Sequence, residues 1–495
     1  MLSDLNKRYV IKLLSNIMNS TIGLAILSIV PRELGPAAYG NFVFLKTIFD
    51  QLMILLDSSS STAFFVKLSS NNARSTLIPF YFLISAILLV GMVLITFIAT
   101  SNGFTEVIFP NIPSGYIYYA LFFSYLLWLF NVFIKISDAY ALTSSVEIIK
   151  VVYKLIYVIT LVVIVNITST IDLYFYYYFN YIALIIFFTV TAYLFKIKGV
   201  FITWKIINFK AIVAEFFQYC HPLVIQGLFS VLITILGMWL LNYQSGAEEV
   251  AYYGLAFQIS AIGILFTAAL IPVIMREFSK ANSDRENKYL RLLFKKYMDP
   301  LFTVAAIMAA FIVVNSEDLV LLFAGPEYVD AAAALSVIGL YTLHQTYGQM
   351  TGGFLLAVNK SKLYANIGLI MLLLDVILVL LFVYYLNFGS YGMALKMLIV
   401  NIVGSNVMLY YVAKIINTNI KPMLLNQLTI TVVFLLIAFL EKSIVSFSDN
   451  IIIDTIVSGS IYLIMSILFI FIFPRIVGIS YARRRGILSL LRLNR

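Results

Sequence analysis

Five ionisable side chains lie inside stretches of the sequence that are otherwise apolar. They are Lys46, Asp50, Asp57, Asp375 and Lys396. A charge at the centre of a membrane helix costs roughly 2.5 to 3.5 kcal/mol on insertion scales, so such residues are functional candidates by default. A lysine at this depth could hold an anion, and a carboxylate could exchange a proton. These residues therefore indicate a path for a polar or charged solute.

Three of these residues share one predicted helix. The spacings from Lys46 to Asp50 and to Asp57 put all three on a single stripe of that helix. At 1.5 Å per residue the stripe runs from roughly 8 Å to roughly 24 Å below the outer end. We expect it to face protein or water. The alternative is a local ion pair between Lys46 and Asp50, with Asp57 near the cytoplasmic interface.

Asp375 and Lys396 lie on two predicted helices that are neighbours in sequence. A structural salt bridge between them is as compatible with the sequence as a role in function. Burial disfavours the charged form of a carboxylate, and a nearby ammonium favours it. Asp50, Asp57 and Asp375 are therefore candidates for ion coupling, and the coupling ion stays open between a proton and sodium.

The elements that carry these residues are predicted to be membrane-spanning helices. The chain is 62% hydrophobic and 11% charged, whereas an ordinary soluble domain is about 25% charged. A span needs about 20 apolar residues. The sequence predicts an all-α polytopic protein with about 14 spans, or 12 to 14 if boundaries shift. The predicted spans are 10–30, 41–63, 77–99, 115–137, 147–166, 172–195, 214–241, 250–275, 300–323, 331–357, 362–386, 391–413, 423–440 and 452–473.

The positions of the basic residues predict the orientation. Lys and Arg concentrate in cytoplasmic segments of membrane proteins. With the N-terminus inside, cytoplasmic segments hold about 29 of the 33 Lys and Arg, whereas only Arg32 and Lys442 fall outside. Lys150 and Lys154 are assigned to the cytoplasmic end of 147–166, the weakest span. We expect both termini in the cytoplasm, and the net charge of +10 calls for no nucleic-acid partner.

Two halves of equal span number organise the predicted chain. Ala38-Tyr39-Gly40 at the second span is echoed by Tyr252-Tyr253-Gly254 at the eighth. Such repeats are typical of transporters with the substrate path between two lobes. We predict two pseudo-symmetric six-helix lobes and two further helices. The predicted parts are an N-lobe 1–198, a C-lobe 199–415 with a charged cytoplasmic loop 276–299, two spans within 416–473 and a basic tail 474–495.

The usual signatures of enzymes are missing from the sequence. There is no phosphate-binding G-x-x-x-x-G-K-[ST] motif, and two histidines, His221 and His344, cannot form H-E-x-x-H. A single cysteine, Cys220, excludes a cysteine metal cluster. We therefore predict a transporter without a metal or cofactor. Tyr174 to Tyr178 lie where an aromatic belt forms, with stacking on sugars as the alternative.

One stretch resembles a known family. Leu34-Gly35-Pro36-Ala37-Ala38-Tyr39-Gly40 resembles the LGPxxYG signature of Wzx-type polysaccharide flippases. The likeness continues through Phe42 to Phe65 and recurs at Gly325-Pro326-Glu327-Tyr328 and from Gly352 to Lys362. It implies the multidrug/oligosaccharidyl-lipid/polysaccharide superfamily, with two six-helix lobes, a central cavity and alternating access.

The resemblance also implies a cargo and a place. Wzx-type flippases deliver an undecaprenyl-diphosphate-linked O-antigen or related repeat unit from the cytoplasmic to the periplasmic face of the bacterial inner membrane. The family's cavity is often cationic, so Lys46, Arg32 and Lys396 are candidate contacts of diphosphate or acidic sugar. The carboxylates of Asp50 and Asp57 differ from the pattern of a purely cationic cavity. Membrane lipids and other polysaccharide assembly proteins are candidate partners. The alternatives are a multidrug exporter of the same superfamily and, less favoured, a membrane glycan polymerase.

Overall fold

The computed structural model describes the backbone of residues 2–57, 60–70, 74–101, 103–168, 171–200, 209–268, 271–283, 287–444, 450–474 and 476. These residues form helices joined by short connections, and no strand occurs among them. Eleven helices of the described chain are long and apolar enough to cross a membrane. The prediction of an all-α polytopic membrane protein is confirmed.

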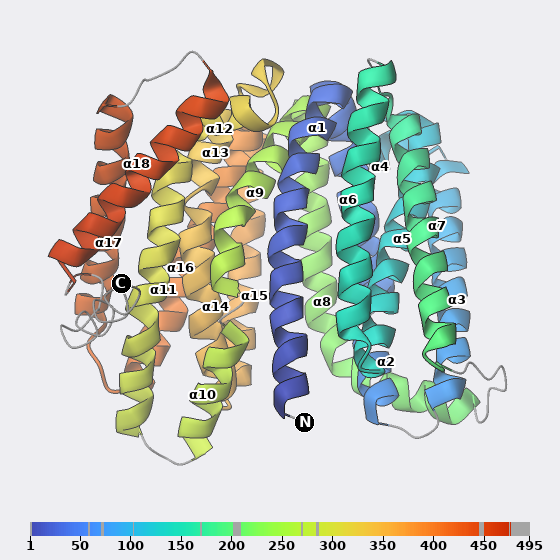
Figure 1. Cartoon of the computed structure of the whole chain (residues 1–495), viewed down its shortest axis with the longest axis horizontal. Helices are drawn as coiled ribbons and strands as arrows, with labels where there is room; N and C mark the ends of the chain where they lie inside the picture. Colours follow the sequence, from blue (N-terminus) through green and yellow to red (C-terminus); the bar gives the residue numbers. More distant parts are fainter. Residues whose placement is uncertain are drawn as a thin grey trace. The chain divides into compact units, whose positions relative to one another are not determined.

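The chain divides into two compact units, Met1–Ala251 and Tyr252–Arg495. The first unit contains α8, which the sequence analysis assigned to the C-lobe, and the predicted lobe boundaries stay predictions. Its helices are α1 (Leu2–Asp57), α2 (Ser60–Ser70), α3 (Arg74–Ser101), α4 (Thr105–Ile108), α5 (Ser114–Ala139), α6 (Thr143–Thr168), α7 (Leu173–Ile197) and α8 (Phe209–Ser245). The dark blue α1 packs against α5, α6 and α8 (Figure 1).

A kink divides α1 into the first two predicted spans. Gly35 has φ 71° and ψ 166°, inside an otherwise helical stretch that also contains Pro31 and Pro36. Only glycine adopts this conformation at little cost. Five residues further on, a Cβ on Gly40 would lie 1.8 Å from the carbonyl oxygen of Ala247. The two glycines of the LGPxxYG stretch therefore have separate physical roles, a change of direction and a close backbone contact.

The second unit is built from the rest of the chain. Its helices are α9 (Ala247–Ala268, from Tyr252 onward), α10 (Ile271–Ser283), α11 (Asn287–Val314), α12 (Ser316–Phe323), η1 (Pro326–Tyr328), α13 (Ala331–Ile338), α14 (Tyr341–Ala357), α15 (Ser361–Val379), η2 (Leu380–Tyr385), α16 (Gly389–Ile415), α17 (Ile420–Ile444) and α18 (Ile451–Ile472). At its centre α14 packs against α11 and α16. Several of the fourteen predicted spans extend over two helices, among them 300–323 over α11 and α12 and 331–357 over α13 and α14.

The predicted charged cytoplasmic segment 276–299 contains helical residues, and its place in the predicted domain plan stays a prediction. The chain is helical on both sides of 284–286, in α10 and at the start of α11. Phe278 and Phe294 are buried with ring centroids 6.2 Å apart, and both contact Phe354 of α14. Apolar residues at helical spacing between the charges therefore hold α10 and α11 together. The predicted tail 474–495 lies outside the described residues except for 474 and 476.

The last two helices, α17 and α18, pack on the second unit. The Tyr462 hydroxyl of α18 donates to the Ile307 carbonyl of α11 at 2.9 Å, and its ring lies 5.5 Å from that of Phe311. Lys442 at the end of α17 forms a 3.0 Å ion pair with Asp318 of α12. These two helices, red and orange-red in Figure 1, are therefore joined to the unit at the C-terminal end of α17 and through Tyr462 of α18.

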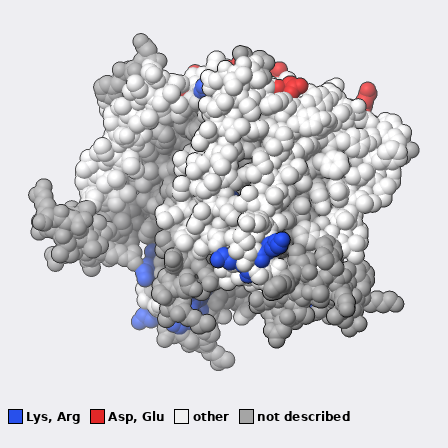
Figure 2. Space-filling view, turned by 45° about the vertical axis from the view of Figure 1, so that its right-hand side comes forward, with Lys and Arg blue, Asp and Glu red and all other residues white. Residues whose placement is uncertain are grey.

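Charged side chains gather along two edges of the face drawn in Figure 2. Acidic side chains lie along its upper edge, and most basic side chains lie along its lower edge. The broad band between them consists of other residues. The predicted orientation, with both termini in the cytoplasm, stays a prediction.

Candidate functional site

A cavity of about 530 Å³ lies within the first unit. Its volume falls in the range of small-molecule sites, about 300 to 1,000 Å³. Four helices that are candidates for crossing the membrane, α1, α5, α6 and α7, supply its walls. The lining residues are Ile26, Lys46, Asp50, Met53, Ile54, Ser124, Leu127, Trp128, Phe130, Asn131, Tyr153, Lys154, Tyr157, Tyr176, Asn180 and Leu184.

Lys46 and Asp50 both line this cavity and bind each other. The Lys46 Nζ atom lies 2.6 Å from Asp50 Oδ2, and the side chains are 38% and 31% exposed. The i,i+4 ion pair that the sequence allowed as an alternative is thus present. The pair is open to the cavity, but the carboxylate balances the charge of Lys46.

Lys154 contributes a second ammonium to the cavity. It lies eleven residues into α6, which is roughly 16 Å along the helix. No hydrogen bond or ion pair reaches it from the described residues. One turn earlier, Lys150 and Glu147 form an ion pair of 2.6 Å and are largely buried. Lys154 is therefore the cation of the cavity wall without a carboxylate at contact distance in the described chain.

Aromatic and amide side chains make up most of the remaining polar wall. The Tyr157 hydroxyl donates to Asn180 Oδ1 at 3.2 Å, and Asn180 Nδ2 donates to the Tyr176 carbonyl at 2.7 Å. Ser124 Oγ and Trp128 Nε1 are buried without a partner among the described residues. Tyr176, read from sequence as part of an aromatic belt, thus lines the cavity, whereas Tyr178 is 51% exposed.

Asp57 does not line the cavity with Lys46 and Asp50. Its carboxylate accepts hydrogen bonds from Ser60 Oγ at 2.9 Å, Ser61 N at 3.1 Å and Ser61 Oγ at 2.8 Å. The Tyr81 hydroxyl of α3 donates a fourth at 3.1 Å. Asp57 thus accepts at the first turn of α2 as an N-terminal capping residue does. The predicted stripe is split, because its last member joins α1, α2 and α3.

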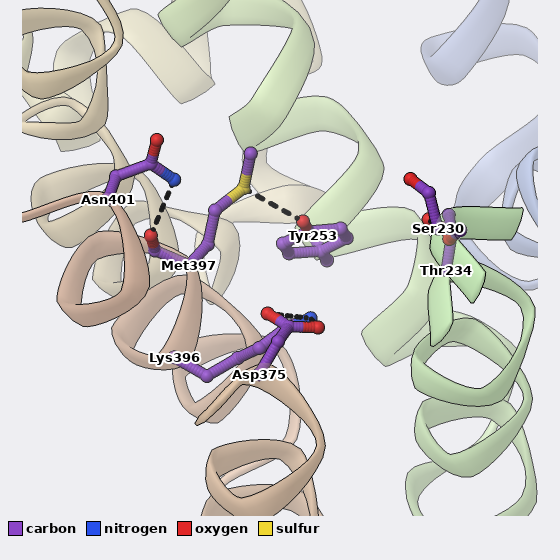
Figure 3. Close-up of polar contacts among 7 residues, drawn as sticks. All are labelled: Ser230, Thr234, Tyr253, Asp375, Lys396, Met397 and Asn401. Atoms are coloured by element: carbon purple, nitrogen blue, oxygen red, sulfur yellow. Dashed lines mark hydrogen bonds and ion pairs between the residues drawn. The ribbon is translucent and has the colours of Figure 1, made fainter. Parts of the chain in front are cut away.

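Asp375 and Lys396 form a buried ion pair in the second unit. Lys396 Nζ donates to both carboxylate oxygens, at 2.9 and 2.7 Å (Figure 3). The Lys396 side chain is 9% exposed and the Asp375 side chain is 14% exposed. Beside them, the Tyr253 hydroxyl points to Met397 Sδ at 3.2 Å (Figure 3). The salt bridge between α15 and α16 that the sequence allowed is present.

Arg32 lies before the kink of α1 and is exposed. It does not line the cavity. Among the six predicted site residues, the structure therefore brings two pairs together, Lys46 with Asp50 and Asp375 with Lys396. The roles assigned to these residues in substrate binding and ion coupling stay predictions.

Lys154 is not predicted as a cavity residue from the sequence, because the predicted helix begins at 147, four residues later than α6. With α6 starting at Thr143, Lys154 moves from the helix end to its middle. Glu147, Lys150 and Lys154 at spacings of three and four form one face of α6. That periodicity was the available signal for a polar face inside a membrane helix.

A comparison with protein families finds one match within the chain. Residues 222–381 match the family model described as MatE. The match covers 160 of the 495 residues and is called the MatE domain here. The comparison with curated proteins found no match in sequence. The MatE domain begins in α8 and ends within the π-helical turns of η2.

Solved structures show how far the fold around the MatE domain extends. The lipid II flippase MurJ in an inward closed conformation shares 15% identity at a TM-score of 0.68, covering 94% of this chain and 98% of that one. An inward-facing MATE family multidrug resistance transporter of the MOP superfamily shares 15% at 0.63, covering 83% and 99%. A MOP superfamily transporter from Pyrococcus furiosus shares 17% at 0.57, covering 83% and 96%.

The chain therefore has the fold of the MOP superfamily transporters. The solved structures that share this fold are a flippase and transporters. Fold similarity does not by itself identify the cargo.

Proposed function

We propose that the protein translocates a lipid-linked oligosaccharide, an O-antigen or related repeat unit on undecaprenyl diphosphate, by alternating access. The observation that carries the proposal is the cavity walled by α1, α5, α6 and α7. Its wall holds two ammonium groups, one carboxylate, amides and four large polar aromatics at membrane depth. Burying such groups is costly, so a polar solute that uses them explains their presence. The proposed direction is from the cytoplasmic to the periplasmic face of the inner membrane.

The extent of the structural likeness supports a lipid-linked cargo. Coverage of this chain is 94% for the lipid II flippase and 83% for the MATE family transporter. α17 and α18 are the two helices that the sequence predicts beyond the two six-helix lobes. A prenyl chain must stay in lipid while its head group crosses, and two additional helices offer lipid-facing surface for it.

The MatE domain favours a second candidate, a multidrug exporter. An exporter of cationic drugs would use carboxylates in its cavity. Here the Asp50 carboxylate is already paired with Lys46, and the cavity carries an excess of one positive charge from Lys154. Charge complementarity favours an anionic head group over a cationic drug.

A sidedness assay on cells lacking the protein tests the proposal. Lipid-linked units are labelled from outside with a membrane-impermeant reagent and compared with the total extracted pool. The proposal expects single units that are protected from the reagent and therefore trapped on the cytoplasmic face. Single units that react at the outer face would indicate a polymerase. Normal glycan with increased drug sensitivity would indicate an exporter.

A further inference from the structure

We infer that the cavity binds an oxyanion carried on a sugar, with Lys154 as the anion contact and Trp128 as the wall against which the ring stacks. This inference rests on the proposed function and deepens it, because it assigns the charged part of the cargo to one wall of the first unit. It replaces the expectation that Lys46 makes this contact. Lys46 is paired with Asp50, whereas Lys154 has no carboxylate at contact distance in the described chain.

The charges of the cavity wall favour Lys154 over Lys46 as the anion contact. Lys46 and Lys154 are the two cations of the cavity wall. The Asp50 carboxylate lies 2.6 Å from Lys46 Nζ, so an incoming anion would compete with a bound carboxylate there. No carboxylate lies within contact distance of Lys154 in the described chain. A hydrogen bond from an ammonium to an oxyanion is among the stronger contacts in proteins, and Lys154 is free to make it.

Two residues of the cavity wall carry hydrogen-bond donors that lack an acceptor in the described chain. Trp128 Nε1 and Ser124 Oγ lie in the cavity wall, on α5, and both atoms are buried without a partner in the described part of the chain. A buried donor without an acceptor costs about 1 to 3 kcal/mol in general. Two such donors on α5 and the Lys154 ammonium on α6 belong to residues that line one cavity, and they favour a ligand that is rich in acceptor oxygens.

Aromatic side chains form a large part of the cavity wall. Trp128, Tyr153, Tyr157 and Tyr176 all line the cavity. Asn180 accepts from the Tyr157 hydroxyl at 3.2 Å and donates to the Tyr176 carbonyl at 2.7 Å. These hydrogen bonds hold the Asn180 amide and the Tyr157 ring in place in the wall. Aromatic faces combined with fixed polar groups provide apolar contact and orientation at once. A sugar ring offers both the C–H surface and the hydroxyls for such a wall.

Calorimetric titration of the full-length protein in detergent tests the inference. The probes are glucose 1-phosphate, glucuronate and glucose, so that phosphate and carboxylate sources are separated. We expect saturable binding of at least one anionic probe. In Lys154→Gln that affinity falls about tenfold or more, while Lys154→Arg retains most of it because the charge remains. Trp128→Ala weakens all sugar probes by a similar factor.

Controls distinguish binding from folding. Lys362→Gln removes an exposed positive charge from α15 and is expected to leave every affinity unchanged. Thermal unfolding of each variant reports whether the fold is intact. Unchanged binding in Lys154→Gln, equal binding of glucose and the anionic probes, or no binding of any probe by the wild type would each overturn the inference. The sidedness assay is independent, so it can support translocation when these titrations fail, and the reverse also holds.

Discussion

Lys396 Nζ lies 2.9 and 2.7 Å from the two oxygens of Asp375, and the pair is buried between α15 and α16. In this bidentate contact both carboxylate oxygens accept from the ammonium, and the two charges balance each other. The geometry therefore favours a structural role for the pair. It leaves little of Asp375 available for a coupling ion in this conformation.

Asp375→Ala is expected to lower the free energy of unfolding by about 3 to 5 kcal/mol, because it leaves the Lys396 ammonium buried and uncompensated. Thermal or denaturant unfolding in detergent measures the loss. The double variant Asp375→Leu with Lys396→Met removes both charges and should unfold close to the wild type. If the double variant folds but loses translocation, the ion-coupling role predicted for Asp375 would gain support over the structural one.

Asp57→Ala is expected to destabilise the first unit by about 2 kcal/mol or more, because four donors lose their acceptor and α2 loses its cap. The unfolding midpoint of the purified protein measures this effect. Thr189→Ala is the control, since its exposed hydroxyl bonds only to the Ile185 carbonyl of its own helix. Equal midpoints for the two variants would contradict the capping role of Asp57.

Gly40→Ala is expected to destabilise the protein by about 1 to 3 kcal/mol, the usual cost of overpacking. The added Cβ would lie 1.8 Å from the Ala247 carbonyl oxygen, so the backbone must move. Gly23→Ala in the same helix is the matched control, because its Cβ would meet nothing within 4 Å. Alanine there is expected to be neutral or stabilising by about 0.5 to 1 kcal/mol. Similar yields and midpoints for both variants would argue against the close contact.

Lys46→Glu is expected to reduce translocation about tenfold or more. It places two carboxylates one turn apart in the cavity wall and repels an anionic head group. Transport into vesicles, normalised to protein level, measures the loss. The exchange variant Lys46→Asp with Asp50→Lys restores one charge of each sign and should recover part of the activity. Unimpaired transport by Lys46→Glu would remove Lys46 and its pair from the cargo path.

The helical plan and one of its ion pairs could be read from the sequence, because both depend on local spacing. Hydropathy identifies a helix by its own residues, and Lys46 and Asp50 are neighbours on one helix by their spacing. The kink at Gly35 lies within the stretch that predicted the break between two spans. These features need no knowledge of what packs against what.

The remaining features depend on contacts between distant segments. Asp57 pairs with Tyr81, which lies on α3, so no spacing within α1 could separate it from the stripe. Lys154 became a cavity residue because α6 begins at Thr143, and element ends are the least certain part of a sequence-based prediction. The cavity itself requires four helices to pack side by side, which hydropathy does not encode.

Reconstitution gives the most direct test of the central claim that the protein moves a lipid-linked glycan across a bilayer. The purified full-length chain is placed in liposomes with a labelled undecaprenyl-diphosphate-linked oligosaccharide, and a membrane-impermeant enzyme outside removes the label from exposed head groups. The account predicts that the protected inner pool becomes accessible with the protein and stays protected in protein-free liposomes. An inner pool that remains protected despite intact, folded protein would contradict it.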